Sequence, residues 1–485
     1  MLIGNLVLNG KVIGFSVEKE DSKYLELIAL KPEVMQSIMG VFGTVGNNVI
    51  IPYLIGQFTT GQICYFYDCS IVEMGLISKR FLISFSKMLI TKDLIVPNFD
   101  INLKIESVNL RGKNINFILE TFDKRNIKDK ECRFVLYNKE RELKIKCLID
   151  GITAVSLNCN ATSKSNRSLY FKFYIENSHD IYDYFYVADT VEKTLNFCCK
   201  LKYKISDEIS FDYIVEDELF RKELLLCSKE TVNDVVNDPS IIDFSVLNLE
   251  DFCKLISCIG NRKNKDMLDL DFLKIFMDNR LNTDFYMSYI KIVQTFENEF
   301  NLKYPNFKVD EKIKERLCEV ILNSYDAEKL KDENGKPLKE SEYNKECESY
   351  IRFLELRTTR LSDKIKYMIN EHKSLLSQKT LNYFKFETLS KQEINDLAVN
   401  LTKNRNSISH GKIYECEITH KTLTLLLGLL EFVYSFYLLE SGIDESKIKV
   451  IIDRLLLGII LDVQKEKIEL CNWKEEYEKQ VRELL

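Results

Sequence analysis

The sequence is poor in the residues that break, link or staple a chain. Its 485 residues include only 6 prolines and 17 glycines, which leaves little room for long disordered linkers. Its 14 cysteines form no Cys-x-x-Cys pair and it has only 4 histidines, which argues against a structural zinc site. We therefore expect a largely folded chain without a metal or a cofactor.

Apolar runs long enough to cross a bilayer are also missing. The best candidate, residues 422–439, contains Glu431 and falls short of the ~20 residues that a membrane-spanning helix needs. Because a charge at the bilayer centre costs about 3 kcal/mol, a buried bundle helix explains this run better. The first residues lack the features of a secretory signal, so we expect a cytoplasmic protein with reduced thiols and no membrane partner.

A surplus of positive charge is the third absence. Asp and Glu number 74 against 68 Lys and Arg, which gives a net charge of -6. Proteins that coat nucleic acid need clustered positive charge, so any nucleic-acid site in this chain must be local. The length is sufficient for two or three domains.

The pattern of residues 1–215 predicts a β-rich domain. Short runs of strand character are separated by turn residues such as Asn9-Gly10 and Asp150-Gly151. Strands are expected at 24–30, 48–55 and 143–149, and one helix at 189–200. From 216 to 344 the spacing becomes helical, with helices expected at 248–259 and 268–300, and we expect this region to connect two domains.

Residues 345–485 predict an all-α helical bundle, which makes the chain an α+β multidomain protein. Ser390 and Glu393 have the spacing of a capping box, so one helix begins there. Further helices are expected at 419–440, before Gly442, and from Asp444 onward. An earlier amphipathic helix is indicated by apolar residues three and four positions apart, namely Ile351, Leu354, Leu361, Ile365 and Met368. Four such helices with short connections make a bundle.

A charged residue continues the apolar face of the helix that follows Ser390. Four positions after Leu401, where another apolar residue is expected, the chain has Arg405. A guanidinium that faces the interior is normally paired with an anion, and the nearby Lys403 and Lys412 disfavour a protein carboxylate as its only partner. A phosphate fits better, which makes Lys403 and Lys412 candidate RNA-binding residues.

His410 is the second residue of the candidate site. It lies five positions after Arg405, about 140° around an ideal helix, so the two side chains do not share a face of a regular helix. Either the helix breaks between them or a second subunit completes the site. Asn406 lies four positions before His410, where its amide is placed to orient the imidazole.

Arginine and histidine without metal ligands suit the cleavage of RNA by its own 2′-hydroxyl. A histidine moves the proton near neutral pH, and an arginine stabilises the charge that grows on the phosphate oxygens. DNA lacks this hydroxyl, so RNA is the expected substrate, and the products would be a 2′,3′-cyclic phosphate and a 5′-hydroxyl end. The alternative is that Arg405 and His410 only cap helix ends and pair with carboxylates.

Arg405-Asn406 followed by His410-Gly411, after a capped helix and before a very apolar one, resembles the HEPN superfamily of metal-independent ribonucleases, in particular its ApeA-type branch. The resemblance covers residues 345–485. It implies that Arg405, Asn406 and His410 are catalytic and that two copies meet as a homodimer to form one cleft. It also implies a bacterial anti-phage protein of the abortive-infection kind, which joins this domain to an N-terminal β-rich domain. Such proteins cleave host RNA, with tRNA among the suspected targets, and a phage-derived trigger would activate this one.

Two other functions remain open. The same bundle would also serve a non-catalytic RNA-binding or adaptor protein as its dimerisation module, and the need for His410 in an effect on RNA separates this function from the ribonuclease. A small-molecule enzyme in the β-rich domain is the third alternative. The sequence offers it no P-loop, no dinucleotide-binding glycines and no nucleophile elbow.

Overall fold

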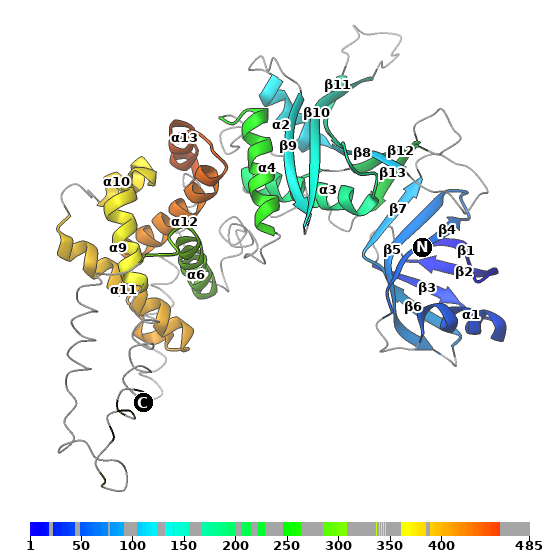
Figure 1. Ribbon diagram of the computed structural model, residues 1–485, viewed down its shortest axis with the longest axis horizontal. Coiled ribbons are helices and arrows are strands. Elements are labelled where there is room, and N and C mark those ends of the chain that lie inside the picture. Colours follow the sequence, from blue (N-terminus) through cyan, green and yellow to red (C-terminus); the bar gives the residue numbers. More distant parts are fainter. Residues whose placement is uncertain are drawn as a thin grey trace, which may run out of the picture. The chain divides into compact units, whose positions relative to one another are not determined.

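A computed structural model shows that the chain forms two compact units (Figure 1). Unit 1 comprises Met1–Met277 with Ser441–Ile443, and unit 2 comprises Asp278–Glu440 with Asp444–Leu485. Strands dominate unit 1 and the described part of unit 2 is helical, so the expected α+β class is confirmed. The structure describes residues 1–18, 23–43, 49–75, 78–91, 104–123, 131–138, 140–154, 166–199, 205–206, 208–214, 222–227, 246–263, 285–307, 336, 339, 341, 343, 345, 360–384 and 389–455.

The strands of unit 1 form one antiparallel sheet in the order β4-β1-β2-β3-β6-β5-β7-β13-β12-β8-β11-β10-β9. An additional pairing of β4 with β5 closes the first part of this order into a ring. The strands are β1 (Leu2–Leu8), β2 (Lys11–Val17), β3 (Tyr24–Ile28), β4 (Ile51–Phe58), β5 (Ile63–Gly75), β6 (Arg80–Ser84), β7 (Lys87–Thr91), β8 (Lys104–Arg111), β9 (Glu131–Asn138), β10 (Arg141–Ala154), β11 (Asn166–Ile175), β12 (Glu208–Ile214) and β13 (Lys222–Cys227). The helices of this unit are α1 (Pro32–Phe42), α2 (Lys113–Asp123), α3 (Ile181–Cys199) and α4 (Leu249–Lys263).

The ring of strands is organised by a tight turn and a packed aromatic interior. Leu8 pairs with Lys11, and Asn9 and Gly10 between them have positive φ angles of 48° and 72°, as a two-residue hairpin of this kind requires. Inside the ring the Phe15 side chain contacts the rings of Phe58 and Phe66 at centroid distances of 5.5 and 5.4 Å. The predicted turn at Asn9-Gly10 is confirmed, and it sets the register of the first hairpin.

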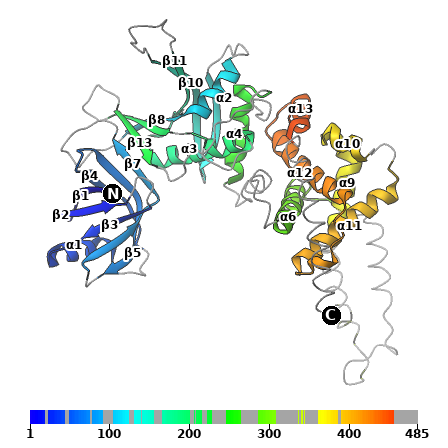
Figure 2. The ribbon, with the colours of Figure 1, turned by 180° about the vertical axis from the view of Figure 1, so that it is seen from behind.

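Two helices cover one face of the remaining strands. Phe171 of β11 lies 5.2 Å from Phe252 of α4, and Phe211 of β12 lies 5.5 Å from Phe185 of α3, measured between ring centroids. Helix α4 runs beside β9 (Figure 1), and Figure 2 shows the same helix from behind. The expected connecting region 216–344 is therefore divided, because it supplies β13 and α4 to unit 1 and a further helix to unit 2. Sequence periodicity missed β13 because its apolar residues follow one another without alternation.

Unit 2 is built around a helix whose middle is buried on all sides. Its helices are α6 (Phe285–Lys303), α9 (Leu361–His372), α10 (Gln378–Phe384), α11 (Lys391–Ser409), α12 (His420–Glu440) and α13 (Glu445–Leu455). Every residue of α12 from Thr424 to Leu438 is buried, and α6, α11 and α13 contact this helix. The apolar run at 422–439 is thus a core helix, as expected. Within the described ranges, no helix has the length and apolarity that crossing a membrane requires.

Local signals placed the ends of these helices correctly. The Ser390 hydroxyl accepts a hydrogen bond from the Glu393 amide at 3.2 Å, and the Glu393 carboxylate accepts one from the Ser390 amide at 2.9 Å. The predicted capping box is therefore confirmed at the start of α11. Gly442 has a φ of 73° just after α12, as a glycine at a helix end should. The predicted helix that includes Ile351 begins in the structure at Leu361, and residues 351–359 lie outside the described ranges.

Glu431, in the middle of α12, holds the start of α10. Its carboxylate accepts a hydrogen bond from the Ser377 amide at 2.8 Å and one from the Thr380 hydroxyl at 3.0 Å. Burial raises the pKa of this carboxyl group to about 7, although the bonds from Ser377 and Thr380 favour the charged form. The side chain therefore binds its proton more tightly in the folded protein than in the unfolded one.

We predict that Glu431→Gln makes the protein less sensitive to rising pH. Because the pKa is raised on folding, the contribution of Glu431 to wild-type stability is highest in acid and falls as the pH rises from about 4.5 through about 7. Glutamine can still accept from the Ser377 amide and can donate to Thr380, without a charge to bury. At pH 8 the variant should be more stable than the wild type by on the order of 2 kcal/mol, with little difference at pH 5.

Melting temperatures at the two pH values measure this difference. Glu417→Gln, at an exposed position between α11 and α12, is the matched control and should change neither value. A Glu431→Gln effect of equal size at pH 5 and pH 8 would show that folding does not raise the pKa of this carboxyl group.

Candidate functional site

The residues of the predicted motif lie on the last turns of α11. This helix stays regular through Ser409, and His410 is its C-cap. Beyond it the Gly411 amide donates to the Ile408 carbonyl at 3.0 Å and the Lys412 amide donates to the Ser407 carbonyl at 2.8 Å, which is a Schellman ending. The φ of 72° at Gly411 explains why glycine follows the histidine. The helix does not break between Arg405 and His410, so the first of the two expected ways to bring them together is wrong.

The guanidinium of Arg405 is half-buried and poorly satisfied. One of its terminal nitrogens donates to the side-chain oxygen of Asn406 at 3.1 Å. The other lies 3.8 Å from a carboxylate oxygen of Glu297 on α6, which is within ion-pair range but too far for a hydrogen bond. Among the described residues, the buried Nε has no hydrogen-bond partner. A protein carboxylate therefore reaches Arg405, but at this distance it forms no hydrogen bond, and the described residues leave most of the N–H groups of the guanidinium unpaired.

Glu297 is held by a second cation. The ammonium group of Lys364 on α9 donates to the other carboxylate oxygen of Glu297 at 2.9 Å, and the Lys364 side chain is only 3% exposed. Lys364 and Arg405 thus share one carboxylate, and the cluster of three side chains carries one net positive charge. The sequence analysis missed both Glu297 and Lys364. Lys364 could have been noticed in the same way as Arg405, because it lies three positions after Leu361 in an apolar stripe.

The other predicted site residues are exposed around the end of α11. The Asn406 side chain accepts a hydrogen bond from Arg405. No described residue forms a hydrogen bond with the His410 ring, so the predicted orienting bond from Asn406 is not seen. Lys403 is exposed, and Lys412 lies 3.4 Å from the carboxylate of Glu415. The structure therefore brings Arg405 and Asn406 into contact and leaves His410 free to meet another molecule.

Asn404 fixes the segment that follows His410. Its side-chain oxygen accepts from the Glu417 amide at 3.0 Å, and its side-chain nitrogen donates to the Glu417 carbonyl at 3.0 Å and to the Asn400 side chain at 2.9 Å. Asn404 is 1% exposed, so these bonds are made away from water. They tie the end of α11 to the chain that leads into α12. Sequence reasoning gave Asn404 no role.

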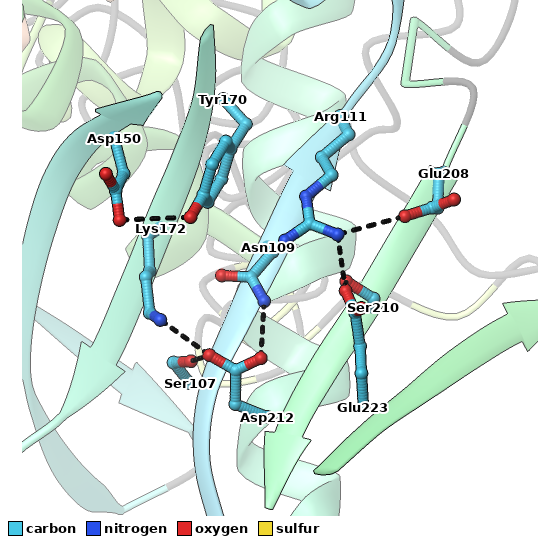
Figure 3. A network of polar contacts seen from close by, with 10 residues as sticks. All are labelled: Ser107, Asn109, Arg111, Asp150, Tyr170, Lys172, Glu208, Ser210, Asp212 and Glu223. Atoms are coloured by element: carbon cyan, nitrogen blue, oxygen red, sulfur yellow. Dashed lines mark hydrogen bonds and ion pairs between the residues drawn. The ribbon is translucent and has the colours of Figure 1, made fainter. Parts of the chain in front are cut away.

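A second polar cluster, which the sequence analysis also missed, lies in unit 1 (Figure 3). The carboxylate of Asp212 on β12 accepts hydrogen bonds from Lys172 on β11 and from Ser107 and Asn109 on β8, the last two at 2.7 and 3.0 Å. Burial by itself would raise the pKa of Asp212, but these three donors hold it below its ordinary value. Asp212 therefore stays charged and links three neighbouring strands.

Arg111 extends this cluster to a fourth strand. Its guanidinium pairs with Glu208 of β12 at 3.2 Å and with Glu223 of β13, and it lies 4.5 Å from the centre of the Tyr170 ring. Lys172 and Arg111 each have a carboxylate partner of their own within the sheet, whereas Arg405 shares its carboxylate with Lys364. We therefore assign the cluster around Asp212 and Arg111 to the stability of the sheet.

We predict that Lys172→Met destabilises unit 1. The change removes the cation from a nearly buried pair and leaves Asp212 with only Ser107 and Asn109 as partners, which should lower the free energy of unfolding by about 3 kcal/mol. Chemical denaturation followed by the fluorescence of tyrosine measures the loss. Lys144→Met, at an exposed position of β10, is the control and should have no measurable effect. Equal stability of the two variants would mean that the Lys172–Asp212 pair does not hold the sheet.

Known proteins give no further information on this site. Comparisons with protein-family models, with curated proteins and with solved structures find no match. Among the described residues, no group of three or more His, Cys, Asp or Glu side chains is placed to hold a metal ion. The candidate site is therefore defined by the charge, burial and contacts of its own residues.

Proposed function

We propose that the chain is a metal-independent endoribonuclease whose helical unit is a HEPN bundle and whose active site contains Arg405 and His410. The observation that carries the proposal is the unsatisfied charge of Arg405. A guanidinium has five N–H groups, and the structure gives one of them a hydrogen-bond partner. Its carboxylate neighbour is already bonded to Lys364, so the cluster can accept an anion such as a phosphodiester.

The proposed reaction is an internal transfer within the RNA. His410 takes the proton of the 2′-hydroxyl, the 2′-oxygen attacks phosphorus, and the bond from phosphorus to the 5′-oxygen breaks. The protonated His410 then gives this proton to the departing 5′-oxygen, so the products are a 2′,3′-cyclic phosphate and a 5′-hydroxyl. Arg405 stabilises the negative charge on the phosphate oxygens in the transition state. Lys403 and Lys412, which are exposed on either side, bind neighbouring phosphates.

A second copy of the chain is part of the proposal. Because α11 is regular up to Ser409, Arg405 and His410 lie on different faces of one helix end. In a homodimer, the exposed His410 of one copy would meet the phosphate held by Arg405 of the other. Asn406 acts by holding the Arg405 guanidinium.

The biological setting that we propose is bacterial anti-phage defence in the cytoplasm. In this setting the enzyme cleaves host RNA, tRNA among its targets, and so stops the infection. The β-rich unit senses a phage-derived trigger or restrains the nuclease. This setting is supported by the resemblance of the Arg405–His410 motif to ApeA-type proteins.

We predict that the wild-type protein cuts bacterial RNA in the presence of EDTA and leaves 2′,3′-cyclic phosphate ends. Arg405→Ala and His410→Ala should each reduce the rate by about 100-fold or more without unfolding the protein. Lys391→Ala, at the opposite and exposed end of α11, should cut like the wild type. Sequencing the fragment ends identifies both the chemistry and the substrate.

Two outcomes would contradict the proposed ribonuclease activity. Full activity of either motif variant would remove that residue from the mechanism. RNA that stays intact with all proteins, also after addition of lysate from phage-infected cells, would favour an RNA-binding or adaptor protein that uses the bundle to dimerise.

A further inference from the structure

Three helices of unit 2 each contribute one charged side chain to the cluster beneath the end of α11. Lys364 of α9 is nearly buried, Glu297 of α6 and Arg405 of α11 are about a quarter to a third exposed, and the carboxylate lies between the two cations. The short contact of 2.9 Å goes to Lys364 and the long one of 3.8 Å goes to Arg405. The deepest member of the cluster is therefore a lysine that RNA bound at the surface would not touch.

We infer that Glu297 orients the Arg405 guanidinium and that Lys364 neutralises the charge of Glu297. The positive charge of Arg405 thereby remains available to a phosphodiester. The inference rests on the proposed function, because it assigns positioning residues to the same site. Neither Glu297 nor Lys364 contacts the substrate in this arrangement. Glu297 fixes the orientation of the guanidinium, and Lys364 offsets the negative charge of Glu297.

The reason is competition between two anions for one guanidinium. A carboxylate within 4 Å of Arg405 attracts it in the same way as a phosphate does, and a carboxylate that is part of the protein is always present. Without Lys364, the pair of Glu297 and Arg405 would be neutral and would bind an anion weakly. With Lys364, the carboxylate directs its short hydrogen bond elsewhere and the cluster keeps one positive charge.

This arrangement makes opposite predictions for two neighbouring charges of the cluster. Lys364→Met leaves Glu297 facing Arg405 alone, so RNA should bind about tenfold more weakly. Glu297→Gln removes the competing charge, so RNA should bind as tightly as to the wild type or more tightly. The same variant should cut about tenfold more slowly, because the guanidinium has lost the carboxylate that orients it. The double variant has the net charge of the wild-type cluster, and its RNA affinity should return to within about threefold of the wild-type value.

Two readouts on the full-length protein test the inference. Binding is measured by fluorescence anisotropy with a labelled 2′-O-methyl RNA, which lacks the attacking hydroxyl, and cleavage is measured with the matching unmodified RNA. Melting temperatures show which variants fold. Lys364→Gln can still donate to Glu297 but carries no charge, and it replaces Lys364→Met if the methionine variant does not fold.

The expected order of RNA affinity is Glu297→Gln at least equal to wild type, then the double variant, then Lys364→Met. If both single variants weaken binding, or if the double variant binds no better than Lys364→Met, the inference is wrong and the cluster only stabilises the fold. A wild-type protein that never cuts RNA would contradict the proposed function, while the binding order would still test the role of the charge pair. A wild type that cuts RNA without this binding order would overturn the inference alone.

Discussion

The carboxylate of Glu297 lies between two cations, and through its two oxygens it links α6 to α9 and to α11. One oxygen accepts from Lys364, which is nearly buried and therefore needs a partner of opposite charge. The other oxygen faces Arg405 at a distance that neutralises the guanidinium only in part. The unpaired N–H groups of Arg405 are thus a consequence of this competition. A site with one surplus positive charge results, although the chain as a whole is acidic.

Hydrogen bonds of the backbone and of one buried side chain hold the end of α11 in place. The Schellman bonds after His410 stop the helix, and the buried side chain of Asn404 ties it to Glu417. These bonds hold the helix end in a regular geometry that places Arg405 and His410 on different faces. His410 is exposed, so a second copy of the chain can contact it without any change in this geometry. The geometry of a single helix end is therefore the physical reason for placing the second copy in the proposed mechanism.

Signals that act within a few residues could be predicted from the sequence, whereas contacts between distant residues could not. The capping box at Ser390, the hairpin at Asn9-Gly10 and the buried helix around Glu431 all follow from local patterns. Arg405 was found because a charge interrupts an apolar stripe, but its neighbour Glu297 lies on another helix, and no spacing rule connects the two. The Lys172–Asp212 pair was missed for the same reason, since only the strand order places β11 and β12 on either side of β8. Helix α3 begins at Ile181, eight positions before the expected start. Its first turns were missed because they are rich in aromatic residues, which favour strands.

RNA cleavage through the 2′-hydroxyl is the claim on which the functional interpretation depends most. It is tested most directly by one synthetic RNA that contains a mapped cleavage site, with a single 2′-deoxynucleotide on the 5′ side of the scissile phosphate. The proposed mechanism predicts that cleavage at this phosphate stops while cleavage at other sites in the same molecule continues. Cleavage of the substituted phosphate at the wild-type rate would contradict it, because the 2′-oxygen could then not be the nucleophile.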